Sequence, residues 1–357
     1  MKEIISLRKP REKHFLNEDG TFTVQMYDYD IHYLENGEYK EIDNSLIELD
    51  SYIKSVKNSF GFRAAKNSPL VTVSQNEKYL TLKLVDFYPK KTEIRNNEIV
   101  YTNNNGLQIK YSLMAGVMKE AIIFENAQSV MDHFKFVVNT NLELVQNANQ
   151  NIIVRDHDNT LFTLKKPYLI DAKRNVNSNV QYYLTKHENQ YEIMIKLDEK
   201  WFKDGNITYP IILDPTIING REENVYDVFL SSENPDKAYG TYHITTIGPD
   251  ENGVGRALLK FTLPELDSSC SIVNATVYLS TLKELGLLNR AIRKVNVHEA
   301  ISDWDEETAT WNNNKDNYSS LVRATFYPTY SPDYSIPNEP VQSNFDLTQL
   351  VKEWYGG

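Results

Sequence analysis

The segment Ser302-Asp303-Trp304-Asp305-Glu306-Glu307-Thr308-Ala309-Thr310-Trp311-Asn312-Asn313 lies near the end of the chain, and Asn344-Phe345-Asp346-Leu347-Thr348-Gln349-Leu350-Val351-Lys352-Glu353-Trp354 follows it closely. Three of the four tryptophans of this 357-residue sequence occur in these two segments. Tryptophan combines a large apolar ring with one N–H group that needs an acceptor when it is buried. The two segments therefore predict either the core of a domain or a flat aromatic surface for a ligand.

Residues 1–218 carry the pattern of β-strands. Short apolar or alternating runs are separated by turn-forming clusters such as Asn103-Asn104-Asn105-Gly106, and helical periodicity is nearly absent. We therefore predict an N-terminal antiparallel β domain over residues 1–218. The clearest strand-like runs are residues 21–26, 80–85, 107–113, 133–138 and 191–197.

A domain boundary is predicted just after Tyr209-Pro210-Ile211-Ile212-Leu213-Asp214-Pro215-Thr216. Its prolines bracket a short apolar strand, and proline ends strands because it has no N–H for the ladder. The strand pattern then restarts, which predicts a jelly-roll-like sandwich over residues 219–357. One short helix is expected over residues 349–354, capped by Asp346-Leu347-Thr348. The expected fold class is all-β, with two antiparallel β domains.

Composition limits the classes of partner. The net charge is −11 and no long basic run occurs, so we expect no nucleic-acid partner, because phosphate binding needs clustered Lys or Arg. Cys270 is the single cysteine, which excludes an intramolecular disulfide. No segment is apolar over the length of a membrane span, and the first residues do not have the pattern of a signal peptide. The export route stays open.

Four features of the second predicted domain carry a family resemblance. They are residues 256–261 before Leu263-Pro264-Glu265-Leu266, the strand over residues 272–279, the motif Trp304…Thr310-Trp311-Asn312, and Phe345-Asp346-Leu347-Thr348…Val351…Trp354. With them the chain resembles the DNRLRE family, whose β-sandwich domains occur in large secreted bacterial and archaeal proteins. Family members usually continue with another turn and strand after the last helix. The resemblance therefore implies that the last strand is missing and that the chain is a fragment or a truncated variant.

The first predicted domain carries a second resemblance, over residues 11–216. Its most distinctive pieces are Asp198-Glu199-Lys200-Trp201, Tyr209-Pro210 and Asp214-Pro215-Thr216. With these the region is similar to the N-terminal region of Gram-positive wall-associated and Rhs (YD-repeat) secreted proteins, although Glu38-Tyr39 stands where tryptophan is more usual. The resemblance implies a secreted or cell-surface protein of several domains, in which these two domains are not catalytic.

Two roles stay open for the tryptophans. In the first, Trp304 and Trp311 hold the sandwich together. In the second, their rings stack on a sugar, since some DNRLRE-like domains are classed as carbohydrate-binding modules of the alginate type. An acidic protein needs a local basic patch to bind an acidic polysaccharide. The candidates for that patch are Lys283, Arg290, Arg293 and Lys294, with Arg256 on a nearby predicted strand.

The acidic residues around Trp304 offer oxygen ligands. Asp303, Asp305 and Glu307 lie within a short span, which suits calcium, although the pattern of an EF-hand loop is absent. Calcium is the single cofactor that we consider. The same acids do not fit glycoside hydrolysis, because adjacent acids of one loop cannot flank a glycosidic bond.

No catalytic motif is recognisable. The seven histidines occur without an HExxH motif, no GxSxG motif exists, and Gly253-Val254-Gly255 is followed by a predicted strand rather than a helix. We expect each histidine to be a satisfied surface or core residue, and we expect that the protein is not an enzyme.

Three hypotheses for the function follow. The first is a non-catalytic scaffold or adhesion segment of a larger bacterial surface, secreted or Rhs-type toxin-delivery protein. The second is a carbohydrate-binding module that binds a wall or matrix polysaccharide through the tryptophans and the basic residues. The third is a structural component of a phage-tail-like particle. The expected partners are other domains of a larger protein, neighbouring chains or a polysaccharide, and the expected location is secreted or at the cell surface.

Overall fold

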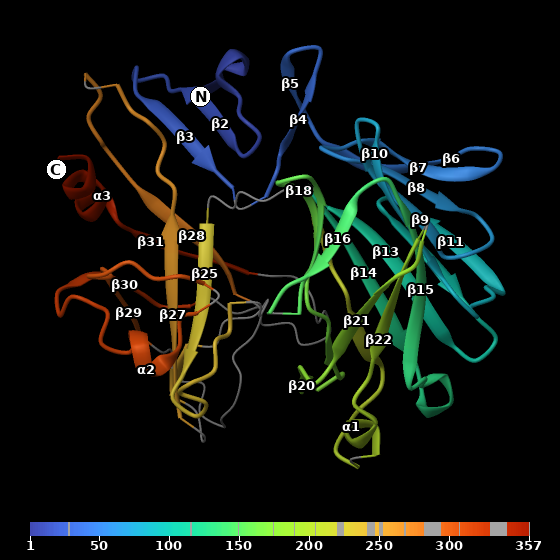
Figure 1. Cartoon of the computed structure of the whole chain (residues 1–357). Coiled ribbons are helices and arrows are strands. Elements are labelled where there is room, and N and C mark those ends of the chain that lie inside the picture. Colours follow the sequence, from blue (N-terminus) through green and yellow to red (C-terminus); the bar gives the residue numbers. More distant parts are fainter. Residues whose placement is uncertain are drawn as a thin grey trace. The chain divides into compact units, whose positions relative to one another are not determined.

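The computed structural model of the chain describes residues 1–27, 29–114, 116–148, 150–173, 175–188, 190–203, 205–219, 225–240, 247–249, 253–267, 269–281, 294–306, 308–328 and 341–356. Strands hold 51% of the residues and helices 8%, which confirms the predicted all-β fold class. The chain divides into two compact units, Met1–Asn224 and Val225–Gly357 (Figure 1). We call them the first and the second unit.

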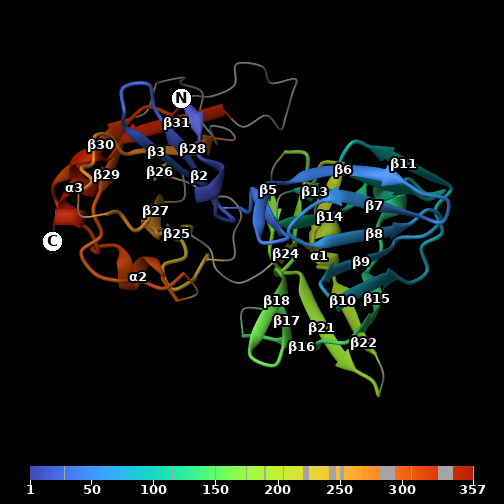
Figure 2. The same ribbon diagram turned by 90° about the horizontal axis from the view of Figure 1, so that it is seen from above.

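Two large antiparallel sheets form most of the first unit, and the strands β6 to β10 lie side by side in one of them (Figure 2). In that sheet the order is β21 (Gln181–Lys186), β22 (Tyr191–Lys196), β15 (His133–Thr140), β10 (Lys78–Leu84), β9 (Leu70–Gln75), β8 (Gly61–Ala65), β7 (Tyr52–Lys57) and β6 (Asp43–Glu48). In the other sheet the order is β11 (Lys91–Arg95), β12 (Glu98–Thr102), β13 (Leu107–Met114), β14 (Val117–Phe124), β24 (Ile217–Asn219), β18 (Asn159–Leu164), β17 (Ile152–Asp156) and β16 (Glu143–Gln146). Beside this path lie β19 (Tyr168–Ile170), β20 (Val176–Asn177) and β23 (Ile211–Asp214).

Alternation along the strands produces the core of the first unit. In β8 the side chains of Phe62 and Ala64 are buried, whereas Arg63 between them is exposed. Successive side chains of a strand point to opposite faces, so each sheet has one apolar face. The buried residues of both sheets belong to one hydrophobic cluster, and Phe124 of β14 lies 5.8 Å from Phe134 of β15, centroid to centroid. The two sheets therefore pack face to face.

A small sheet and a hairpin complete the N-terminal part of the first unit. The hairpin consists of β4 (His32–Glu35) and β5 (Glu38–Glu41), joined by Asn36 and Gly37 with φ of 54° and 83°. A type I′ turn needs positive φ at both central residues, which Asn-Gly adopts readily. This turn sets the register, in which His32 lies opposite Glu41. The small sheet has the order β1 (Lys2–Glu3), β2 (Glu12–Leu16) and β3 (Phe22–Met26), and the first unit also contains the short helices η1 (Ile5–Leu7), η2 (Ala127–Ser129) and α1 (Glu199–Lys203).

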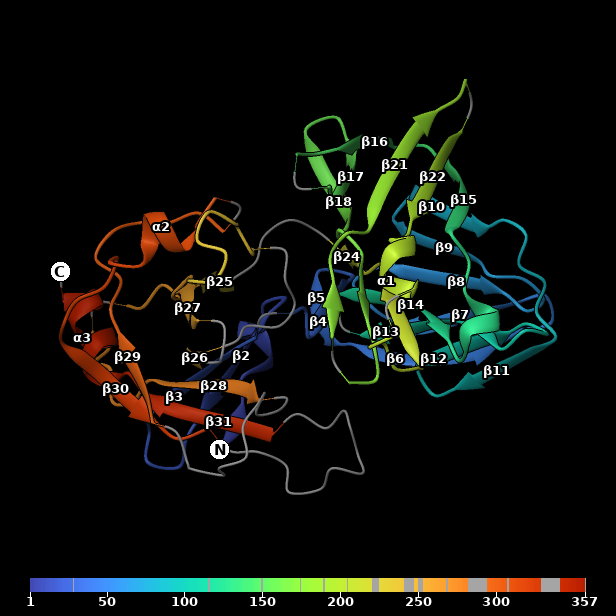
Figure 3. The same ribbon diagram turned by 90° about the horizontal axis from the view of Figure 1, so that it is seen from below.

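Smaller antiparallel sheets form the second unit. Among the described residues they are β25 (Val225–Ser231) with β27 (Val254–Phe261) and β26 (Gly248–Pro249), β28 (Thr276–Thr281) with β31 (Val341–Asp346), and β29 (Val295–His298) with β30 (Val322–Phe326) (Figure 3). Because β29 and β30 lie between β28 and β31 in the sequence, the pairing is nested, as in a jelly roll.

Two short helices belong to the second unit, α2 (Trp311–Asn314) and α3 (Thr348–Gly356). The predicted C-terminal helix is confirmed as α3. Asp346 caps it, because its carboxylate accepts from the N–H and the hydroxyl of Thr348. None of the helices in the described parts of the chain is long and apolar enough to cross a bilayer.

The carboxyl group of Glu120 is buried in the core of the first unit. Glu120 of β14 is 3% exposed and lines a small cavity together with apolar side chains and Tyr182. Among the described residues, neither Glu120 Oε1 nor the Tyr182 hydroxyl has a hydrogen-bond partner. Burial raises the pKa of Glu120 from 4.5 to about 8, and the nearby charge of Asp214 adds to this effect. Glu120 is therefore largely protonated at neutral pH.

This raised pKa predicts a pH-dependent stability of the first unit. Between the ordinary pKa and the folded-state pKa the folded chain binds the extra proton, so the free energy of unfolding falls as the pH rises through that window. We expect a fall of about 1.4 kcal/mol per pH unit between about pH 5 and about pH 8, and we expect Glu120→Gln to remove this slope. Native-state hydrogen exchange of peptides from β13 and β14, read by mass spectrometry, measures it.

The matched control is Glu125→Gln, because Glu125 directly follows the same strand but is exposed. We expect this variant to keep the slope of the wild-type protein. A slope that persists in Glu120→Gln would contradict the buried carboxyl group as its source.

Candidate functional site

One face of β27 carries the tryptophan-rich segment of the second unit. Arg256, Leu258 and Lys260 alternate along this strand, so their side chains lie on the same face. Leu258 packs against a hydrophobic cluster that contains Trp304 and also has Trp311 packed against it. Arg256 lies over the indole ring of Trp311, and Lys260 lies over that of Trp304.

Trp304 is a core residue. Its side chain is 7% exposed and lies in a cluster with Val228 and Leu230 of β25. The ammonium group of Lys260 lies 5.1 Å from the centroid of the Trp304 ring and donates to the Trp304 carbonyl at 2.8 Å. A sugar would need an open ring face, and this ring has a cation over it in an otherwise buried position. Of the two roles that the sequence leaves open, the structure therefore favours the packing role for Trp304.

Trp311 is placed differently, at the start of α2. It is partly buried, and the guanidinium carbon of Arg256 lies 5.1 Å from its ring centroid and 5.0 Å from the centroid of Tyr318. Such cation–π contacts hold a guanidinium in a fixed orientation. Tyr318 is 40% exposed. We call Arg256, Trp311 and Tyr318 the Arg256 site.

Arg256 has no carboxylate partner among the described residues. Besides the two rings, it contacts the carbonyl oxygen of Lys315, to which its Nη1 donates. A guanidinium carries five N–H donors, so several of them stay available for a ligand. The Arg256 site therefore combines a guanidinium that no described carboxylate neutralises with partly exposed aromatic rings.

A buried asparagine supports this site. Asn317 is 7% exposed. Its side-chain oxygen Oδ1 accepts from the N–H and the hydroxyl of Ser302, both at 2.8 Å. Its amide donates to the Ser302 carbonyl and to Asn314, both at 3.0 Å. Asn317 thus ties the chain before Trp304 to the end of α2 and fixes the backbone next to Tyr318.

His298 adds a further contact. Its ring meets that of Tyr318 edge to face at 5.3 Å, and its Nδ1 donates to the Ser319 carbonyl at 2.8 Å. The ring of Tyr318 is thus positioned by His298 as well as by Arg256. Sequence reasoning missed Tyr318 and Asn317, because in an Asn-rich chain their segment has the composition of an ordinary solvated turn.

The structure describes one of the remaining predicted basic residues. Lys294 is exposed, whereas Lys283, Arg290 and Arg293 lie outside the described residues. Lys260 is a basic residue that the prediction did not include, and it faces the same side of β27 as Arg256.

Two of the predicted calcium ligands are engaged in protein contacts. The carboxylate of Asp303 is 2.8 Å from the ammonium group of Lys260, which lowers the pKa of Asp303 below its usual value. The carboxylate of Asp305 accepts from the N–H and the hydroxyl of Thr308, both at 3.1 Å, and so closes a turn. Glu307 lies outside the described residues. Calcium binding here stays a prediction.

Residues 221–356 match the family model of carbohydrate-binding module family 96. This range contains the whole Arg256 site. The resemblance to a family of secreted sandwich domains is thereby confirmed in part, as a match to a carbohydrate-binding family over nearly the same residues. No solved structure matches the chain.

Two curated bacterial proteins are similar over both units. The chain is 23% identical to the tRNA3(Ser)-specific nuclease WapA of Bacillus spizizenii over 393 residues, and 23% identical to the tRNA nuclease WapA of Bacillus subtilis strain 168 over 399 residues. Each alignment covers 99% of this chain and 16% of the relative. The chain therefore spans about one sixth of the length of the relatives that it matches.

The buried position of Trp304 predicts a large loss of stability on truncation. We expect Trp304→Ala to lower the free energy of unfolding of the second unit by about 3–5 kcal/mol, because it removes a buried ring and leaves a cavity. Pulse proteolysis in increasing urea, with the fragments identified by mass, measures this loss.

Trp354→Ala is the control, because Trp354 is 42% exposed and its indole N–H donates to Glu299 at 2.8 Å. We expect it to cost about 1 kcal/mol. Equal losses for the two variants would contradict the core role of Trp304.

Proposed function

We propose that the second unit binds an anionic polysaccharide through the Arg256 site, as a non-catalytic part of a larger bacterial surface or secreted protein. The proposal rests on the position of Arg256. Its guanidinium group lies over two aromatic rings and has no carboxylate partner among the described residues. It lies within the residues that match a carbohydrate-binding family.

The chemistry of the site fits a uronic acid. A guanidinium presents two parallel N–H groups to a carboxylate, and charge-assisted bonds of this kind are stronger than neutral ones. The exposed part of Tyr318 offers apolar surface to the C–H groups of a pyranose ring, and the partly buried Trp311 provides the second ring contact of the guanidinium. Lys260 lies on the same face of β27 but is paired with the carboxylate of Asp303, so we assign the contact with the ligand to Arg256.

The negative net charge of the chain favours binding of an anionic ligand at the Arg256 site over binding elsewhere on the surface. At a net charge of −11 the protein repels anionic polymers in general, so an anionic ligand is expected to bind where positive charge is concentrated. This dependence on a few charges predicts that binding weakens as the salt concentration rises.

We propose no catalytic role for this chain. The sequence contains no recognised catalytic motif, and its acidic balance disfavours binding to the phosphates of a nucleic acid. The relatives are named as tRNA nucleases, and this chain corresponds to 16% of their length. In a protein of that kind, we place nuclease activity outside the part that aligns with this chain.

The location follows from the same reasoning. A unit that binds an acidic polysaccharide acts where such polymers occur, in the wall or the matrix outside the cell. The resemblance of residues 11–216 to wall-associated secreted proteins agrees with this location, and so does the similarity to the WapA proteins over both units.

Affinity electrophoresis in gels that contain alginate, compared with gels that contain a neutral β-glucan, tests the proposal. We expect retardation by alginate alone, and we expect Arg256→Gln to weaken binding at least about tenfold, because a charge-assisted bond contributes about 1.5–3 kcal/mol. Tyr318→Ala should weaken binding by a smaller factor.

The matched control is Tyr278→Ala, since Tyr278 of β28 is 62% exposed and lies outside the Arg256 site. Circular dichroism of each variant shows whether its fold is intact. Folded Arg256→Gln protein that binds alginate as the wild type does, or equal retardation by the neutral glucan, would contradict the proposed site.

A further inference from the structure

A buried histidine of the first unit has one ring nitrogen without a hydrogen-bond partner in the described part of the chain. His32, the first residue of β4, is 1% exposed. Its Nδ1 donates to the Lys9 carbonyl at 2.7 Å, whereas its Nε2 has no hydrogen-bond partner among the described residues. A buried polar atom without a partner is costly and needs an explanation. The expectation that every histidine is satisfied is therefore wrong for His32.

The hydrogen bond of Nδ1 determines which nitrogen can act as a ligand. A carbonyl oxygen can only accept, so Nδ1 carries a proton and the lone pair of the neutral ring is on Nε2. Metal-binding histidines usually have this arrangement, in which the second nitrogen donates to a backbone carbonyl. Burial lowers the pKa of His32 and thereby favours the neutral ring.

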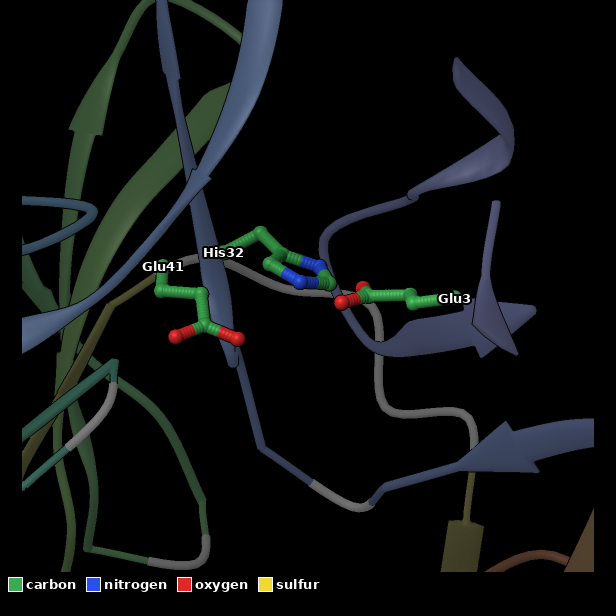
Figure 4. Close-up of side chains that lie close together, drawn as sticks. All are labelled: Glu3, His32 and Glu41. Atoms are coloured by element: carbon green, nitrogen blue, oxygen red, sulfur yellow. The ribbon is translucent and has the colours of Figure 1, made fainter. Parts of the chain in front are cut away.

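Two carboxylates lie beside this ring. Glu41 of β5 is the cross-strand neighbour of His32, and Glu3 comes from β1. Figure 4 shows the imidazole between the two carboxyl groups. One ligand atom of each of the three side chains lies within 4.8 Å of those of the other two, which no other group of His, Cys, Asp and Glu achieves in the described part of the chain.

Two basic side chains hold these carboxylates in place. Arg8 donates to both oxygens of Glu3, at 2.7 and 2.8 Å, and lies 3.4 Å from Glu41 Oε1. Lys13 donates to the same Glu41 oxygen at 2.7 Å. These contacts lower the pKa of Glu3 and of Glu41, so both stay ionised. Among the described residues no donor reaches Glu41 Oε2, which leaves that oxygen for another cation.

We propose that Glu3, His32 and Glu41 bind one divalent transition-metal ion of the zinc type. The set of one imidazole and two carboxylates suits Zn²⁺, which accepts nitrogen and oxygen ligands at about 2.0–2.2 Å, better than Ca²⁺, which prefers oxygen ligands alone. Closure around the ion requires the exposed carboxylate of Glu41 to rotate toward Nε2. The ion would supply the partner that Nε2 lacks and would join β1 to the hairpin.

The positive neighbours limit the affinity of this site. Arg8 and Lys13 balance the charges of the two carboxylates, so an added ion brings excess positive charge. We therefore expect moderate affinity rather than the tight binding of structural zinc sites. The ion should also bind more weakly at low pH, because protons compete for its ligands.

Isothermal titration of the chelator-treated full chain with ZnCl₂ tests the proposal. We expect one ion per chain and at least about tenfold weaker binding in Glu41→Gln, whose side chain is 58% exposed and is unlike a core position. Nitrogen-15 spectra of the wild-type protein labelled at histidine provide a measurement that needs no variant. Zinc should shift the Nε2 signal of His32. The Nδ1 signal should remain that of a protonated nitrogen.

Two control variants separate this site from weaker surface binding. Glu38→Gln removes an exposed carboxylate from the same hairpin, and His157→Gln removes a 93% exposed histidine that lies 3.2 Å from Asp156. Both should bind zinc as the wild type does. The proposal is overturned if zinc does not bind stoichiometrically, if Glu41→Gln binds it equally well, or if the signal of another histidine shifts in place of His32. Alginate binding should be unchanged in Glu41→Gln, so failure here is distinguishable from failure of the proposed function.

Discussion

The tryptophan-rich segment of the second unit depends on one face of a single strand. β27 presents a leucine between two cations, and the tryptophan-rich segment lies across all three of them. The apolar part of this contact excludes water, and the cations at its two ends lie over ring faces. An aromatic ring accepts a cation over its face while its remaining surface stays in apolar contact. This is why a segment rich in Asp, Asn and Thr can still cover a hydrophobic strand.

The two ends of that face differ in solvent exposure. We assign a structural role to the buried end and ligand binding to the exposed end. At the Lys260 end the ring is buried and the cation is bound by a carboxylate and a carbonyl. At the Arg256 end the neighbouring Tyr318 is open to solvent and the guanidinium has only a carbonyl and two rings as contacts in the described residues. The same kind of contact therefore stabilises the unit at one end and offers a charged, aromatic surface at the other.

The fold class was predictable, because alternation and turn clusters are local signals that a sequence shows directly. The roles of individual residues were less so. Trp304 and Trp311 look alike in sequence, and only the packing of the segment over β27 distinguishes the buried ring from the partly exposed one. Asn317 resembles a turn residue until its side chain is seen to bridge Ser302 and Asn314. Spacing along β27 could have indicated that Arg256 and Lys260 share a face, since residues four apart on a strand point the same way.

The neighbours of His32 illustrate what sequence alone does not contain. Glu3 lies far from it in the chain, and nothing local predicts their proximity. The opposite position of Glu41, in contrast, follows from the Asn36-Gly37 turn, because a two-residue loop permits one register. This turn also restricts how the hairpin can vary. One inserted residue would shift the pairing by a single position and move the side chain of Glu41 to the other face of the ribbon. Substitutions along β4 and β5 can be absorbed one at a time, whereas a change in the length of this loop alters every cross-strand pair at once.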